Sequence, residues 1–197
     1  MRLSKLQFAS LVVLCLVLPG AANAAGAVLG ARAGVSVAKA SLDASQTFAS
    51  ENRTGFAGTI FLDLGGALLN IQPEVSYIQK GLKDGNSGET LELDYFEAAA
   101  LLKAGLPLPV LQPHVFGGIA ADFRVQDNIP ADIQFSAKNA DWNLLFGADV
   151  KFARKKFVLY ADGRYAMGLT DVTQTSDVVH DLKNRAWILS AGIGMPF

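Results

Sequence analysis

The closing stretch of the sequence, AWILSAGIGMPF (residues 186–197), decides the fold. Side chains alternate along a β-strand, so this stretch has one large apolar face and one face of smaller residues. The large face carries Trp187, Leu189, Ala191, Ile193, Met195 and Phe197. Most soluble chains end in a polar, frayed segment rather than in such a strand. The large face therefore meets either a protein core or lipid.

Seven further segments alternate in the same way and are separated by turns, which predicts strands of about ten residues. They are residues 28–38, 54–63, 69–79, 91–102, 111–123, 141–152 and 157–169. The fourth has the least regular alternation, and its EAAALLKAGL contains good helix formers. We predict a strand there, with Glu97 facing inward and Asp94 near a rim.

The connections between these segments alternate in length. Residues 40–53, 80–90, 124–140 and 170–184 form long polar links, whereas residues 64–68, 103–110 and 153–156 form short ones. Outer-membrane barrels have short periplasmic turns and long extracellular loops. The pattern predicts an all-β protein, an eight-stranded antiparallel up-and-down transmembrane β-barrel with both mature termini on the periplasmic side.

The two faces of the strands indicate which side meets lipid. The minority face carries charges of both signs on nearly every strand, and it is rich in Gly and Ala, as a narrow lumen requires. Four aromatic residues lie toward strand ends, where interfacial girdles form: Trp142, Tyr165, Trp187 and Phe197. A soluble lipocalin-like barrel would have the opposite arrangement, with an apolar cavity and a polar outside.

The first 24 residues resemble a secretory signal peptide. Two basic residues in MRLSK precede an apolar run at residues 6–19, and Ala22-Asn23-Ala24 matches a cleavage site. We therefore predict a cleaved signal peptide at residues 1–24 and a barrel domain at residues 25–197. The single Cys, Cys15, lies inside the signal, so the mature chain is expected to have no disulfide. Its net charge of −3 gives no support to a nucleic-acid partner.

Several segments resemble the bacterial outer-membrane β-barrel domain proteins, a group often called porin-family or PorT-like. IQPEVSYIQKG (residues 71–81) is similar to the family's LQPELLYSQKG, and LDYFEAAALLK (residues 93–103) to its LDYLEIPLLLK, with Ala99 in place of Pro. QPHVFGGIAADF (residues 112–123) resembles its KPYLFAGP strand. The resemblance implies an eight-stranded barrel in a Gram-negative outer membrane. It also implies that Phe197 helps the barrel-assembly machinery to recognise the chain.

The inward charges are the one group of residues that could carry chemistry. We expect a polar network in the lumen made of Arg32, Asp63, Glu74, Glu97, Asp149, Lys151, Asp162 and Arg164. It could serve as an ion path, but an eight-stranded interior is just wide enough for side chains to fill, which favours a plug. Buried charges need partners, and such a network supplies them.

The sequence indicates no catalytic, cofactor-binding or metal-binding residues. The two histidines, His114 and His180, lack a convincing serine partner, and no His or Cys group has metal-ligand spacing. We expect a non-enzymatic outer-membrane protein of structural or interaction role that contacts outer-membrane lipid and presents loops to an unidentified extracellular partner. The alternatives are a small passive pore, a periplasmic lipocalin-like carrier and, least favoured, a lipid-modifying outer-membrane enzyme.

Overall fold

The computed structural model describes residues 26–41, 50–51, 53–66, 68–84, 90–128, 140–154, 156–169 and 183–197. These form nine strands: β1 (Val28–Ser41), β2 (Ser50–Glu51), β3 (Arg53–Gly65), β4 (Leu69–Asp84), β5 (Thr90–Gly105), β6 (Leu111–Asn128), β7 (Ala140–Ala153), β8 (Val158–Gly168) and β9 (Lys183–Pro196). Within these ranges no helix is both long and apolar enough to cross a membrane. The predicted signal peptide and His180 lie outside them.

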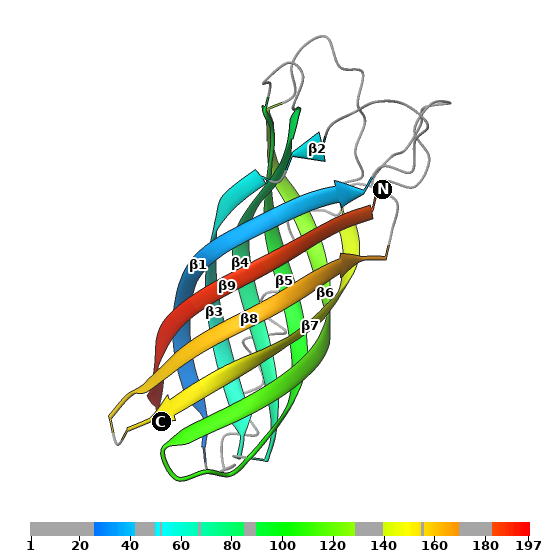
Figure 1. Ribbon diagram of the computed structural model, residues 1–197. Coiled ribbons are helices and arrows are strands. Elements are labelled where there is room, and N and C mark those ends of the chain that lie inside the picture. Colours follow the sequence, from blue (N-terminus) through cyan, green and yellow to red (C-terminus); the bar gives the residue numbers. More distant parts are fainter. Residues whose placement is uncertain are drawn as a thin grey trace, which may run out of the picture.

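Eight of the strands close into an antiparallel barrel (Figure 1). Each strand pairs with its neighbours in the chain, β4 pairs with β5, and β1 pairs with β9 over its whole length, so the circle has no open edge. The short β2 lies in the predicted link 40–53 and pairs only with the end of β4. The predicted eight-stranded barrel is confirmed, and the segment with helix formers is part of strand β5.

The strands are longer at the loop end than the alternation predicts. β4 runs to Asp84 instead of residue 79, and β6 runs to Asn128 instead of residue 123. Backbone pairing continues there, because ladder hydrogen bonds need no apolar alternation. At the other end Phe157 precedes β8 rather than beginning it. There Gly65 adopts a left-handed φ of 137°, which favours Gly in the tight turn between β3 and β4.

The faces are arranged as an inverted barrel. The exposed large residues on the outside are apolar, and they include Ile60, Val115, Trp187, Leu189 and Met195. Trp187 and Phe197 are ten residues apart along the last strand and its final residue. That is about 33 Å of strand, or about 25 Å along an axis tilted by ~40°, the height of an outer-membrane barrel's apolar band.

The beginning of β1 and the end of β9 lie together at the end of the barrel with the short turns (Figure 1). The backbone N–H of Phe197 donates to the carbonyl of Ala27 at 3.0 Å, which ties the two ends together. Val28 pairs with Pro196 in the same place. The long connections leave from the opposite end, so the two rims differ as the loop lengths predict.

Candidate functional site: the charged lumen

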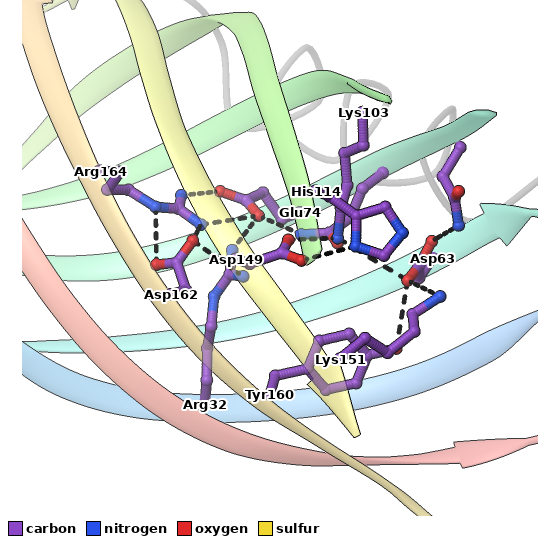
Figure 2. A network of polar contacts seen from close by, with 12 residues as sticks. Arg32, Asp63, Glu74, Lys103, His114, Asp149, Lys151, Tyr160, Asp162 and Arg164 are labelled. Atoms are coloured by element: carbon purple, nitrogen blue, oxygen red, sulfur yellow. Dashed lines mark hydrogen bonds and ion pairs between the residues drawn. The ribbon is translucent and has the colours of Figure 1, made fainter. Parts of the chain in front are cut away.

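Sixteen polar or charged residues are buried on the described part of the chain, and most of them face the lumen. Alternation brings them there, because every barrel strand turns one residue in two inward. The structure places all eight residues of the expected lumen network among them: Arg32, Asp63, Glu74, Glu97, Asp149, Lys151, Asp162 and Arg164. Seven of the eight belong to two connected groups of contacts, which Figure 2 shows.

The first group is the arginine centre, made of Arg32, Glu74, Asp162 and Arg164. Both guanidinium groups donate to the carboxylate of Glu74. Arg164 also makes a bidentate pair with Asp162, with Nε–Oδ1 and Nη2–Oδ2 distances of 3.1 Å. Ser190 donates to the same carboxylate at 2.9 Å. Bidentate pairs of this kind fix geometry as well as charge.

The second group is the lysine centre, made of Asp63, Lys103, Asp149 and Lys151. Lys103 Nζ lies 2.5 Å from Asp149 Oδ2 and 3.8 Å from Asp63 Oδ2. Lys151 Nζ lies 2.8 Å from Asp63 Oδ2. Two neutral side chains also donate hydrogen bonds to the Asp63 carboxylate: Asn70 at 2.6 Å and Tyr160 at 3.1 Å.

Gln72 joins the two centres. Its amide nitrogen donates to Glu74 at 2.8 Å, and its amide oxygen accepts from Lys103 at 3.0 Å. Each centre holds two cationic and two anionic side chains, so the four Arg and Lys charges balance the four carboxylates. Balance matters because an isolated buried charge costs several kcal/mol.

Contacts of this network cross the full width of the barrel. Arg164 on β8 and Glu74 on β4 are four strands apart in an eight-stranded circle, and Lys151 on β7 and Asp63 on β3 are also four apart. Strands that are four apart lie on opposite walls. The side chains therefore meet across the lumen instead of lining it, at two levels of the barrel.

Apolar side chains also fill the lumen, which the expectation of a polar interior did not include. Leu101, Phe116 and Leu145 belong to one buried cluster, and Phe61 and Tyr160 pack edge to face at 4.9 Å in another. The Arg32 and Arg164 guanidinium groups lie over the rings of Phe61 and Phe116, at 5.0 and 5.4 Å. The interior of an eight-stranded barrel is narrow enough to be packed like a protein core. The inward positions are therefore constrained by side-chain volume as well as by polarity.

Glu97 stands apart from both centres. It is fully buried and faces Ser76 on one side and Asp122 on the other in the strand register, nearer the loop end. The four expected interface aromatics lie on the outside, with Tyr165 and Trp187 in ring contact at 5.0 Å and Phe197 exposed at the turn end. Trp142 is half exposed near the start of β7.

The sequence reasoning missed Lys103, the most buried cation of the network. The residue was assigned to the short link 103–110, but β5 extends to Gly105. Strand parity could have found it, because Lys103 is six residues from the inward Glu97 and so shares its face. Gly105 leaves room for the His114 ring, since a Cβ there would lie 2.1 Å from the Cδ2 of His114.

His114 is the one described residue that could suggest catalysis. Its Nδ1 lies 3.0 Å from Asp149 Oδ1, which is the pairing of a base with an orienting carboxylate. That carboxylate is also held by Lys103, and no group of three or more potential metal ligands occurs among the described residues. Asp149 therefore connects His114 to the lysine centre.

Comparison with known proteins agrees with this geometry. Neisserial surface protein A (NspA) matches with a TM-score of 0.56 and 17% identity, over 86% of this chain and 97% of its own. OprG of Pseudomonas aeruginosa matches with a TM-score of 0.52 and 11% identity, over 88% and 97%. The outer membrane enzyme PagL is more distant, with a TM-score of 0.40 and 13% identity over 83% and 99%.

No curated protein matches the sequence significantly. The solved structures share less than a fifth of their residues with this chain, so they show its fold alone. A sequence model of a protein family is more decisive. The outer membrane protein beta-barrel domain matches residues 8–194, nearly the whole chain. The protein belongs to the outer membrane β-barrel domain family.

Proposed function

We propose that this protein is a non-enzymatic outer-membrane barrel whose lumen is closed by its own side chains and whose long loops form a recognition surface. The observation that carries the proposal is the pair of ion contacts that cross the lumen, Arg164–Glu74 and Lys151–Asp63. They join opposite walls within a charge-balanced network. An ion entering the lumen would have to break these buried contacts between charged side chains.

The apolar cluster strengthens this reading. Leu101 and Leu145 are fully buried, and Phe116 nearly so, in one cluster on the inner wall. Apolar constrictions oppose ion flow by excluding water, even where some space remains. A closed lumen therefore rests on packed apolar side chains as well as on the ion contacts.

Planar-bilayer conductance tests the closed lumen. The wild-type protein should give no steady channel, whereas a Glu74→Ala, Arg164→Ala, Leu101→Ala triple variant should conduct, because it removes bulk from the ion contacts and from the apolar cluster. The matched control is Lys156→Gln, an exposed site at the turn end, which should behave as the wild type. Steady channels in the wild type would overturn the closed lumen and favour the alternative of a small passive pore.

We further infer that the loop end faces outside and that both mature termini are periplasmic. Short periplasmic turns and long outer loops are general in outer-membrane barrels, which supports this orientation. Single cysteines at Ser176, in a long connection, and at Lys156, in a short turn, should respond differently to a membrane-impermeant maleimide on intact cells. Labelling at Lys156→Cys but not at Ser176→Cys would reverse the orientation.

The remaining alternatives fit the geometry less well. A lipocalin-like carrier needs an apolar cavity and a polar exterior, the reverse of the arrangement of Glu74 inside and Leu189 outside. An enzyme would need a nucleophile beside its base, and the partners that the structure gives to His114 are groups of the lysine centre. Unchanged lipid composition in cells that express His114→Ala and His180→Ala variants would agree with a non-enzymatic protein.

A further inference from the structure

The turn end of the barrel carries an apolar surface that the closed lumen does not explain. The turn between β5 and β6, at the lower end of Figure 1, contains Leu106, Leu108 and Val110, and each of these side chains is about half exposed. Exposed apolar side chains that lie together mark a surface that contacts lipid or another protein. We call residues 106–110 the apolar turn.

Backbone hydrogen bonds and two prolines hold the apolar turn in one conformation. The N–H of Leu106 donates to the carbonyl of Pro113 at 3.0 Å, and the N–H of Leu108 donates to the carbonyl of Leu106 at 2.8 Å. Pro107 and Pro109 each fix one backbone φ angle. A ligand therefore meets a preformed apolar surface and does not have to order a flexible loop.

The turn between β7 and β8 places positive charge beside the apolar turn. The N–H of Ala153 donates to the carbonyl of Val110 at 3.1 Å, which joins the two turns. Arg154 and Lys156 are exposed at the second turn. The guanidinium of Arg154 lies 4.6 Å from the centre of the Phe152 ring, and this contact holds the charge close to the outer wall.

The turn end carries no acidic side chain that could balance this charge. The segments that form it contain neither Asp nor Glu: residues 26–29, 64–69, 104–113, 153–158 and 194–197. Such a surface attracts an anion and offers no partner to a positively charged group. It therefore favours a ligand that has a phosphate and lacks an ammonium group.

The position of Arg154 along the barrel places this charge at the edge of the apolar band. Trp142 and Phe152 share the outward face of β7 by alternation and are ten residues apart. That is about 33 Å of strand, or about 25 Å along an axis tilted by ~40°, which is the height of the band. With Trp142 at one interface, Phe152 lies at the other, and Arg154 lies just beyond it among the headgroups.

The apolar turn lies at the same depth. Leu111 is the register partner of Phe152, so the apolar turn leaves β6 at the edge of the band. A turn of five residues that folds back on itself reaches at most about 8 Å beyond the strand ends. The headgroup layer is about 5–8 Å thick on each side of the hydrocarbon core. The apolar turn therefore stays within this layer and continues the lipid-facing surface of the barrel.

We propose that the two turns bind an anionic phospholipid, with its phosphate at Arg154 and the upper part of its acyl chains against Leu106, Leu108 and Val110. Charge complementarity selects the phosphate, and continuity with the lipid-facing band selects a lipid over an acidic protein. Phosphatidylglycerol has this chemistry, whereas phosphatidylethanolamine carries an ammonium group that the turn end cannot pair. The lipid belongs to the inner leaflet when the turn end is periplasmic, so this part of the inference rests on the proposed orientation.

Native mass spectrometry of the purified barrel in detergent, with equal amounts of phosphatidylglycerol and phosphatidylethanolamine as the probe, tests the site. The wild type should retain phosphatidylglycerol in at least fivefold excess. Arg154→Gln should lower this preference about fivefold, which corresponds to about 1 kcal/mol, the contribution of one basic residue near an anionic surface. Leu108→Ser should weaken the retention of both lipids about fivefold and leave the preference unchanged, because both lipids have acyl chains.

Matched controls separate charge and position from general effects. Arg185→Gln removes an exposed cation near the loop end, and Arg154→Lys keeps the charge of the turn, so both should show the preference of the wild type. Met195→Ser removes an exposed apolar side chain of β9, four strands from β5, and should retain both lipids as the wild type does. Heat-modified mobility on gels verifies that every variant is a folded barrel.

Several results would overturn the inference. These are equal retention of the two lipids by the wild type, a preference that survives Arg154→Gln, and a loss of preference in Arg185→Gln or Arg154→Lys as large as in Arg154→Gln. Unchanged retention of both lipids by Leu108→Ser would also overturn it and leave the apolar turn to a protein partner. Because binding in detergent depends neither on orientation nor on a closed lumen, failure here is distinct from failure of the cysteine-labelling and conductance tests.

Discussion

Neutralising Glu74 is the sharpest test of how the lumen is held together. Its carboxylate accepts hydrogen bonds from both arginines of the arginine centre and, at 2.8 Å, from Gln72. Glu74→Gln keeps the volume of the side chain but removes its charge. Arg32 and Arg164 would then share the single carboxylate of Asp162, which leaves one uncompensated positive charge in a site with side chains at most 2% exposed.

Removing one partner of a buried ion pair costs about 3–5 kcal/mol, largely because the other charge stays buried. We expect Glu74→Gln to lose that much free energy of unfolding. The second change Arg32→Gln restores neutrality, because Arg164 keeps its bidentate pair with Asp162. The double variant should therefore be more stable than Glu74→Gln alone, with a coupling free energy of about 1–3 kcal/mol.

Equilibrium urea unfolding in lipid vesicles measures both quantities. The only two tryptophans, Trp142 and Trp187, both lie half exposed on the outer wall and report on contact with lipid. Lys156→Gln is the control, since an exposed charge contributes little. A Glu74→Gln variant within 1 kcal/mol of the wild type, or a double variant less stable than the single one, would refute the reasoning that charge balance holds the lumen together.

Three other consequences follow from the outer face and the chain end. Ile119→Arg places a charge within the apolar band and should lower the free energy of unfolding by about 2–4 kcal/mol, whereas Leu111→Arg, at the turn-end edge of the band, should lower it by about 0–1 kcal/mol. The same unfolding assay measures both losses, and equal losses would contradict the assigned depth. Ala191→Asp should lower the amount of heat-modifiable barrel in outer-membrane fractions. Wild-type amounts of this variant would contradict the assignment of Ala191 to the lipid-facing side. Deletion of Phe197 should severely reduce the amount of barrel assembled in cells. The purified barrel should lose only about 1 kcal/mol of unfolding free energy, because one backbone hydrogen bond to Ala27 is removed. A similar loss in the cellular assembly assay and in the unfolding assay would indicate that Phe197 has a packing role alone.

Which face each strand presents to the lumen could be predicted from sequence, because the period of two is a local property of a strand. Arg32, Asp63 and Glu74 were assigned inward on parity alone, and they are buried in the structure. Strand ends were harder to predict, since alternation fades outside the lipid band while backbone pairing continues. That is why β4 and β6 extend five residues beyond their predicted ends.

Partner choice within the lumen could not be predicted from sequence. Whether Lys151 meets Asp63 depends on the stagger of β7 relative to β3, which are four strands apart, and stagger is a property of the closed barrel. The same holds for the outer wall, where Ala33, Ala191 and Ala161 on β1, β9 and β8 fall in one row. Each alanine alone is unremarkable in its own strand.

The dependence on stagger explains why this lumen combines charges with a packed apolar layer. An open sheet of the same strands would leave Arg164 and Glu74 on distant strands and in water, so their contact forms only when β9 pairs with β1. Each cross-lumen pair thus favours one closed register, because a slip of one residue would turn these charges toward lipid. Apolar residues such as Leu101 and Leu145 supply volume but would tolerate several registers. The charges therefore specify which barrel forms, and the apolar layer fills it.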